Sequence, residues 1–142
     1  MFRSLDDSIM VAPQIGVDDV AAAADQGVTL IINNRPDGES PDQTSGETIE
    51  AAAHAKGLHY IAIPVTHAGF SLPQVEAMAA ALSGAEGKVL AYCRSGTRST
   101  LLWALAQARR GENVDGLAAK AARAGYDLAP IRTMLDMAAG QR

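Results

Sequence analysis

The sequence predicts a single α/β domain, residues 1–142, in which helices flank a mostly parallel central sheet of about four to five strands. Short β-branched runs alternate with helical stretches of about 10–15 residues, the usual pattern of a parallel sheet with crossover helices. With 142 residues, 48% hydrophobic and 20% charged, the chain is long enough to bury a core without disulfides or metals. It contains no internal repeat, low-complexity tract or linker that would divide it.

Apolar periodicity and boundary residues predict the elements of the first half. We expect these segments in order: extended pieces over 2–12, a helix over 17–26, a strand over 28–32, a second helix, and a strand over 60–65. Thr44 and Glu47 have the spacing of a capping box, so Thr44 should begin the second helix. A polar loop with two prolines precedes it over residues 35–45, and loops of that length are often functional.

The second half is predicted from the same kinds of signal. Ser71 and Gln74 form a capping box for a third helix, and a strand is expected over residues 88–92. A helix over residues 99–110 is apolar almost all round, so we expect it to be buried. Two final helices should begin at the N-caps Asn113 and Asp127.

The expected nucleophile is Cys93, which directly follows the strand over 88–92 and precedes a helix. A thiol attacks only as its thiolate, and three features favour that anion: the N–H groups of a helix N-terminus, the charges of Arg94 and Arg98, and Gly96, which lets the backbone fold around an anion. The other loop side chains add hydroxyls that could bind a thiolate or oxyanion: Ser95, Thr97 and Ser99. The alternative is that Cys93 is only a small buried hydrophobic residue.

The spacing between Cys93 and Arg98 separates two chemistries. Cysteine-dependent phosphatases resemble this site but place five residues between the two, whereas this chain has four, and Ser99 is the sixth residue after the cysteine. Tyr92 precedes the cysteine, where those phosphatases usually have His. The segment 92–99 instead resembles the active loop of rhodanese sulfurtransferases, which hold a persulfide on the cysteine in a shorter loop.

Motifs spread along the chain resemble one family. These are Gln14 and the segments 31–39, 63–65, 92–99 and 124–127. Together they resemble the DUF442 family, the phosphatase-like domain of beta-lactamase-hydrolase-like proteins, also called a sulfur transferase family. The resemblance covers nearly the whole chain and implies a dual-specificity-phosphatase-like α/β fold with a rhodanese-like loop length.

The same resemblance implies partners. In that family the domain can be fused to a metallo-β-lactamase-type persulfide dioxygenase or encoded near sulfide-oxidising enzymes, so an enzyme of either kind is an expected partner. The three histidines, His54, His59 and His67, lack the His-x-His-x-Asp-His spacing of that dioxygenase. We therefore expect no dioxygenase site, no metal and no cofactor in this chain.

A general acid is not evident in the sequence. Phosphatases of this fold take an Asp from a loop after an earlier strand, but the matching loop here, residues 64–70, has no carboxylate, and His67 is either an acid or an exposed loop residue. Arg35, Asp37 and Glu39 follow the second strand, at the edge where open α/β sheets bind ligands. Arg35 could bind an anionic substrate and Asp37 could supply the acid, or the three could belong to a structural ion-pair loop.

The leading hypothesis is a rhodanese-type sulfurtransferase. Cys93 would take sulfane sulfur from thiosulfate or a persulfide donor, hold it as a persulfide, and pass it to a thiol or cyanide. The loop amides and Arg98 would stabilise the anionic groups. Two alternatives stay open: a nonclassical cysteine-dependent phosphatase working through a phosphocysteine, and a non-catalytic anion- or redox-sensing module.

Composition limits the expected partners and location. A net charge of −4 without a basic stripe argues against nucleic acid. The single cysteine excludes an internal disulfide, and neither a signal peptide nor an apolar run of roughly 20 residues is visible. We expect a cytoplasmic protein that acts on a small anionic sulfur or phosphate substrate, away from membranes.

Overall fold

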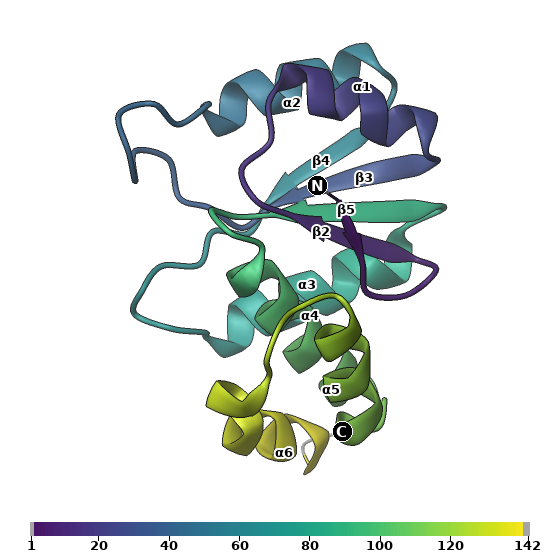
Figure 1. Cartoon of the computed structure of the whole chain (residues 1–142), viewed down its shortest axis with the longest axis vertical. Coiled ribbons are helices and arrows are strands. Elements are labelled where there is room, and N and C mark those ends of the chain that lie inside the picture. The colour runs from purple at the N-terminus through teal and green to yellow at the C-terminus, as the bar shows by residue number, and fades with distance from the viewer. Residues whose placement is uncertain (1, 141–142) are drawn as a thin grey trace.

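The computed structural model describes residues 2–140, and in them a five-stranded sheet with the strand order β1-β2-β5-β3-β4 forms the centre (Figure 1). Its strands are β1 (Arg3–Ser4), β2 (Ile9–Ala12), β3 (Val28–Asn33), β4 (His59–Ala62) and β5 (Lys88–Tyr92). The short edge strand β1 is antiparallel to β2, and the other four are parallel to one another. The predicted mostly parallel sheet is confirmed.

Helices cover both faces of the sheet. The helices on one face are α1 (Val17–Asp25) and α2 (Gly46–Ala55), and those on the other are α3 (Leu72–Gly84) and α4 (Thr97–Arg109). Two further helices, α5 (Val114–Arg123) and α6 (Arg132–Gly140), pack against α4 as an outer layer, with a 3-10 turn over Ala129–Ile131 between them. Figure 1 shows α1 and α2 above the sheet and the other four helices below it. Within residues 2–140, no helix combines the length and apolar character needed to cross a bilayer.

The alternation of side chains in β5 divides the interior into two cores. Leu90 and Tyr92 pack with α1 and α2, whereas Val89 and Ala91 pack with the α3 and α4 side. A strand buried on both faces reads as one continuous apolar run, which explains the sequence pattern. Helix α4 is buried over most of its surface, including the fully buried Trp103, as predicted.

Several predicted element ends need correction. Helix α2 is capped by Ser45, whose hydroxyl accepts the Thr48 N–H, so the capping box predicted from Thr44 and Glu47 is wrong. Strand β4 ends at Ala62, before Pro64, which has no N–H to donate to a ladder. Helix α4 begins at Thr97, two residues earlier than expected, because Gly96 takes a left-handed conformation and serves as its N-cap.

The last N-cap is also corrected. Asp127 accepts the Ala129 N–H at the head of the 3-10 turn, and α6 begins only at Arg132. In contrast, Asn113 caps α5 as predicted by accepting the Gly116 N–H. Ser71 and Gln74 likewise form the predicted capping box of α3. The errors shift the helix ends by a few residues and leave the order of the elements unchanged.

The parallel strands bring three loops to one edge. Ala12, Asn33 and Ala62 are the last residues of β2, β3 and β4, and they lie in register along the sheet with Tyr92, the last residue of β5. The segments that follow β3, β4 and β5 therefore leave the sheet at the same edge, on the left of Figure 1. This carboxyl edge is where open α/β sheets bind ligands.

Candidate active site

Cys93 lies at the centre of this edge, in the turn from β5 to α4. Its side chain is fully buried, and its backbone N–H donates to the Ala12 carbonyl at 3.4 Å. The Gly96 N–H points at the thiol, with 3.1 Å between the nitrogen and Cys93 Sγ. The predicted strand–cysteine–helix arrangement is present, and a backbone donor at the start of a helix already faces the sulfur.

Backbone amides around the sulfur are available for an anion. In the described part of the chain, no acceptor is found for the N–H groups of Arg94, Ser95, Arg98 and Ser99. Orphan amides of this kind at a helix N-terminus bind oxyanions, and a helix dipole adds favourable charge. The Ser99 hydroxyl is also buried and lacks a partner among residues 2–140.

Arg98 comes from the first turn of α4 and reaches across the edge to both neighbouring loops. Its Nη1 donates to Glu39 Oε2 at 2.8 Å and to the Val65 carbonyl at 2.7 Å, and its Nη2 donates to Glu39 Oε1 at 2.8 Å. The hydrogen bond with Glu39 is the largest cause that raises the pKa of Arg98, and the charge of Cys93 adds to it. Arg98 is thus a cation fixed beside the cysteine.

Glu39 is the acceptor that holds this arginine. The hydrogen bond from Arg98 is the largest cause lowering its pKa, to about 2, with a further hydrogen bond from Arg35. The carboxylate is therefore ionised at any physiological pH. Its side chain retains 16% exposure, and the Arg98 side chain 13%, so water screens this ion pair only in part.

Arg35 also bonds Glu39, and within residues 2–140 no hydrogen bond joins its side chain to Cys93. Its guanidinium is buried and donates to Glu39 Oε1 at 2.9 Å, Gln14 Oε1 at 3.0 Å and Ser40 Oγ at 3.2 Å. Of the two roles left open by the sequence, the ion-pair loop is the one that this geometry matches.

Asp37 is engaged away from the cysteine loop. Its Oδ1 accepts the Gly46 N–H at 2.8 Å, which satisfies one of the orphan donors at the beginning of α2. Asp37 is exposed, and so is His67 in the loop after β4. Among residues 2–140, no hydrogen bond joins either side chain to Cys93, so neither is held as a proton donor at the sulfur.

The remaining loop residues face outward. The Ser95 hydroxyl donates to Thr97 Oγ1 at 3.0 Å, and both side chains are exposed. Arg94 is exposed too, while its carbonyl accepts the Gln14 N–H at 3.3 Å. These side chains are open to solvent, whereas Cys93 and Ser99 are buried.

Three comparisons with known proteins place the chain in a family. Residues 1–110 match the family described as beta-lactamase hydrolase-like protein, phosphatase-like domain. The chain belongs to this family. A beta-lactamase hydrolase-like protein of Xylella fastidiosa (strain 9a5c) is 33% identical over 138 residues, which are 96% of this chain and 32% of that protein. The chain therefore spans about a third of the length of this curated relative.

Solved structures of other proteins share the fold of this chain. A candidate phosphatase of Neisseria meningitidis is 35% identical, covers 96% of each chain and superimposes with a TM-score of 0.83. Human DUSP28 is 20% identical, with a TM-score of 0.67 over 99% of this chain and 96% of its own, which shows the shared fold alone. The dual-specificity-phosphatase-like fold expected from the resemblance is confirmed, and the chain is a phosphatase-like family member.

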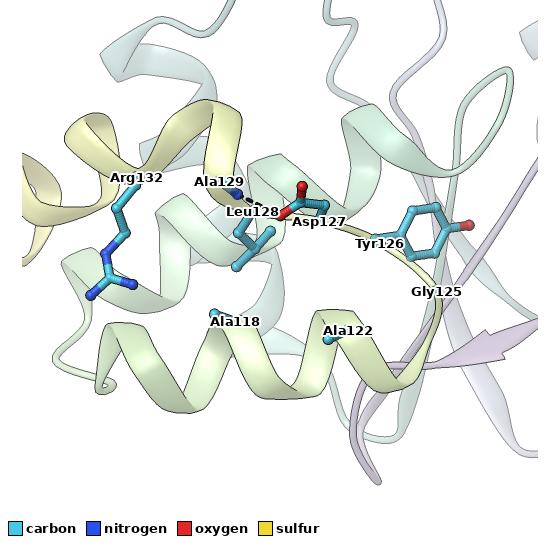
Figure 2. A pocket seen from close by; sticks show the side chains of 8 residues that line it. All are labelled: Ala118, Ala122, Gly125, Tyr126, Asp127, Leu128, Ala129 and Arg132. Carbon is cyan, nitrogen blue, oxygen red and sulfur yellow. Dashed lines mark hydrogen bonds between the residues drawn. The ribbon is translucent and has the colours of Figure 1, made fainter.

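Three residues of the site had no chemical role assigned from the sequence: Gln14, Tyr126, and Glu39, which was expected only as a member of the ion-pair loop. The Tyr126 hydroxyl donates to the Ser95 carbonyl at 3.1 Å, and Arg3 lies over its ring at 5.7 Å from the centroid. Tyr126 stands at one end of a groove of about 690 Å³ between α5 and the segment 125–132, as Figure 2 shows. All three residues lay within motifs of the resemblance, but their partners are distant in sequence.

Metal binding has no support in the described residues. Among residues 2–140, no group of three or more His, Cys, Asp or Glu side chains is arranged to hold a metal ion. The polar groups near Cys93 are instead N–H donors, hydroxyls and the guanidinium of Arg98, with Glu39 as the one carboxylate bonded to that guanidinium. Such a donor-rich site suits an anion.

Proposed function

We propose that this chain is a cysteine-dependent phosphatase. The observation that carries the proposal is the set of amides around Cys93 that have no acceptor within residues 2–140, with Arg98 fixed beside them. A phosphoryl group carries charge on three oxygens, and preorganised donors that already face their position stabilise its transfer without reorganisation. The likeness to a 35% identical candidate phosphatase supports the same reaction.

The proposed reaction has two steps. The Cys93 thiolate attacks phosphorus, so that an S–P bond forms while the ester P–O bond breaks, and the leaving oxygen takes its proton from solvent water. Water then attacks the phosphocysteine, the S–P bond breaks, and inorganic phosphate and the thiolate are released. The loop amides and Arg98 bind the phosphoryl oxygens in both steps, and the Gly96 N–H stabilises the sulfur when it carries charge.

The leaving group sets the substrate class. The loop over residues 64–70 supplies no carboxylate, and general-acid help is typically worth about 10²–10⁴ in rate. Aryl phosphates need little such help because their leaving oxygens are weakly basic. We therefore expect aryl phosphates to be preferred over alkyl phosphates.

Sulfur transfer, the leading hypothesis from the sequence, is the second candidate. Two observations favour it: only four residues separate Cys93 from Arg98, and sulfite leaves thiosulfate without a general acid. The comparisons support the phosphatase alternative better, since the family and its solved relatives are described as phosphatase-like. A persulfide dioxygenase or sulfide-oxidising enzyme would be the partner only if this second function held.

The mass of the trapped intermediate distinguishes the candidates. The protein is mixed with para-nitrophenyl phosphate or with thiosulfate, quenched in acid and weighed intact, with Cys93→Ser as the matched control. A phosphocysteine adds about 80 Da and a persulfide about 32 Da to the Cys93 form only. We expect the heavier adduct and release of phosphate. The persulfide alone would establish the sulfurtransferase, and neither adduct nor turnover would leave a non-catalytic anion- or redox-sensing module.

A further inference from the structure

A line of bonded side chains runs from Gln14 through Arg35 and Glu39 to Arg98 at the cysteine loop. We propose that Glu39 is a positioning residue that orients Arg98, so that one edge of its guanidinium faces an anion bound at Cys93, while Arg35 keeps the cluster positive. The inference rests on anion binding at Cys93, which both candidate functions require.

The donors of Arg98 show which edge is available. An arginine has five N–H donors in a fixed planar fork. Both hydrogens of Nη1 are engaged, by Glu39 and by the Val65 carbonyl, and one hydrogen of Nη2 is engaged by Glu39. Within residues 2–140 no hydrogen bond uses the Nε–H or the second Nη2–H, and in the planar group these two point along the same edge. An edge of this kind can bind two oxygens of one anion.

Glu39 determines where that edge points. Its two oxygens bond Nη1 and Nη2 at 2.8 Å each, which fixes both the direction and the plane of the guanidinium. Glu39 is itself fixed by Arg35, whose side chain is only 4% exposed. Without the carboxylate, Arg98 would keep its bond to Val65 but could rotate about it.

Arg35 offsets the negative charge that Glu39 brings to the site. A lone carboxylate at this distance would cancel the charge of Arg98 and repel an incoming anion. Glu39 together with Arg35 and Arg98 carries a net charge of +1, so the site attracts an anion while its arginine stays fixed. Arg35 thus acts in two ways: it fixes Glu39, and its positive charge attracts the anion.

An electrostatic role and a positioning role of Glu39 predict opposite changes in anion binding when Glu39 is replaced. If only charge mattered, Glu39→Gln would remove a negative charge and strengthen anion binding. If Glu39 positions Arg98, the same variant weakens anion binding and turnover, because the binding edge is no longer held. Glu39→Asp retains the charge but withdraws the carboxylate by one methylene, so any loss in that variant also reports position.

The test measures the dissociation constant of inorganic tungstate by calorimetry, together with kcat/KM for para-nitrophenyl phosphate and Tm. The control is Glu47→Gln, an exposed acid in the first turn of α2 that makes the same charge change. We expect both Glu39 variants to bind tungstate several-fold more weakly and to lose up to roughly a hundredfold in kcat/KM. Glu47→Gln should match the natural protein in both.

Three results would overturn the inference. Tungstate binding that is unchanged or tighter in Glu39→Gln would assign Glu39 a purely electrostatic or structural role. If Glu39→Gln fails to fold, Glu39→Asp decides instead. A lower Tm with unchanged tungstate binding in Glu39→Asp would likewise assign Glu39 a purely structural role. If the natural protein does not bind tungstate, there is no anion site for the free edge of Arg98 to serve, and the inference fails. A protein that binds tungstate as expected but forms no phosphocysteine would refute the proposed function and leave the role of Glu39 standing.

Discussion

Replacing Gly96 with alanine tests how tightly the cysteine loop is packed. Gly96 has φ +90°, a left-handed conformation that disfavours every L side chain. A Cβ there would also collide with Tyr126 Oη and come within 3.0 Å of its Cζ. Since the Gly96 N–H bonds Cys93 Sγ, a shift that relieves the collision moves the donor away from the sulfur.

The expected cost follows from these contacts. Left-handed backbone costs an alanine about 1–2 kcal/mol, and losing the hydrogen bond from Tyr126 to the Ser95 carbonyl costs about 0.5–1.5 kcal/mol more. We expect Gly96→Ala to lower the free energy of unfolding by about 2–3 kcal/mol. For a chain of 142 residues this corresponds to a fall in Tm of about 6–10 °C.

A matched control separates the two contributions. Gly27 also has φ +90°, but nothing lies within 4 Å of a Cβ built on it. Gly27→Ala should therefore show the backbone cost alone, about 1–2 kcal/mol, measured by urea unfolding and thermal melts. Tyr126→Phe in the Gly96→Ala background removes the colliding oxygen, so the double variant should lose less stability than the two single variants added together.

Two results would refute the reasoning. If Gly96→Ala costs no more than Gly27→Ala, Tyr126 does not hold the loop in solution. If Gly96→Ala keeps full turnover and anion binding, the Gly96 amide is not needed at the sulfur. Strictly additive losses in the Tyr126→Phe double variant would separate the two residues energetically.

Two further predictions concern the cation and the carboxylate. Arg98→Ala should weaken binding of sulfate and lower kcat/KM together, measured by calorimetry and initial rates, and loss of one without the other would contradict a shared anion site. Glu39 has a pKa lowered from 4.5 to about 2, so its stabilising effect is fully present above about pH 5 and is lost as the pH falls towards 2. The stability difference between the natural protein and Glu39→Gln should therefore shrink in urea unfolding at low pH, and a constant difference would show that the ion pair contributes nothing.

Local sequence patterns were sufficient for the order of the elements. The strand of residues 88–92 is bounded as predicted, and Cys93 follows it directly, because an apolar run and the glycine before it are short-range signals. The errors fall at helix ends. Ser45 and Gly96 are the observed N-caps of α2 and α4, and each lies close in sequence to the residue that was predicted to begin the helix. Adjacent capping residues compete within about one turn, so sequence alone does not select between them.

By itself the sequence determined the α/β fold, the position of Cys93 between strand and helix, and the arginines around it. Only the tertiary structure decided what those arginines contact. Glu39 and Arg98 are 59 residues apart in the chain, and Tyr126 bonds a carbonyl 31 residues earlier. Periodicity and capping act over a few residues, whereas Glu39 and Arg98 meet because parallel strands bring separate loops to one edge of the sheet, and Tyr126 reaches the cysteine loop from the end of helix α5. Because of that convergence, Arg98 shares the carboxylate of Glu39 with Arg35.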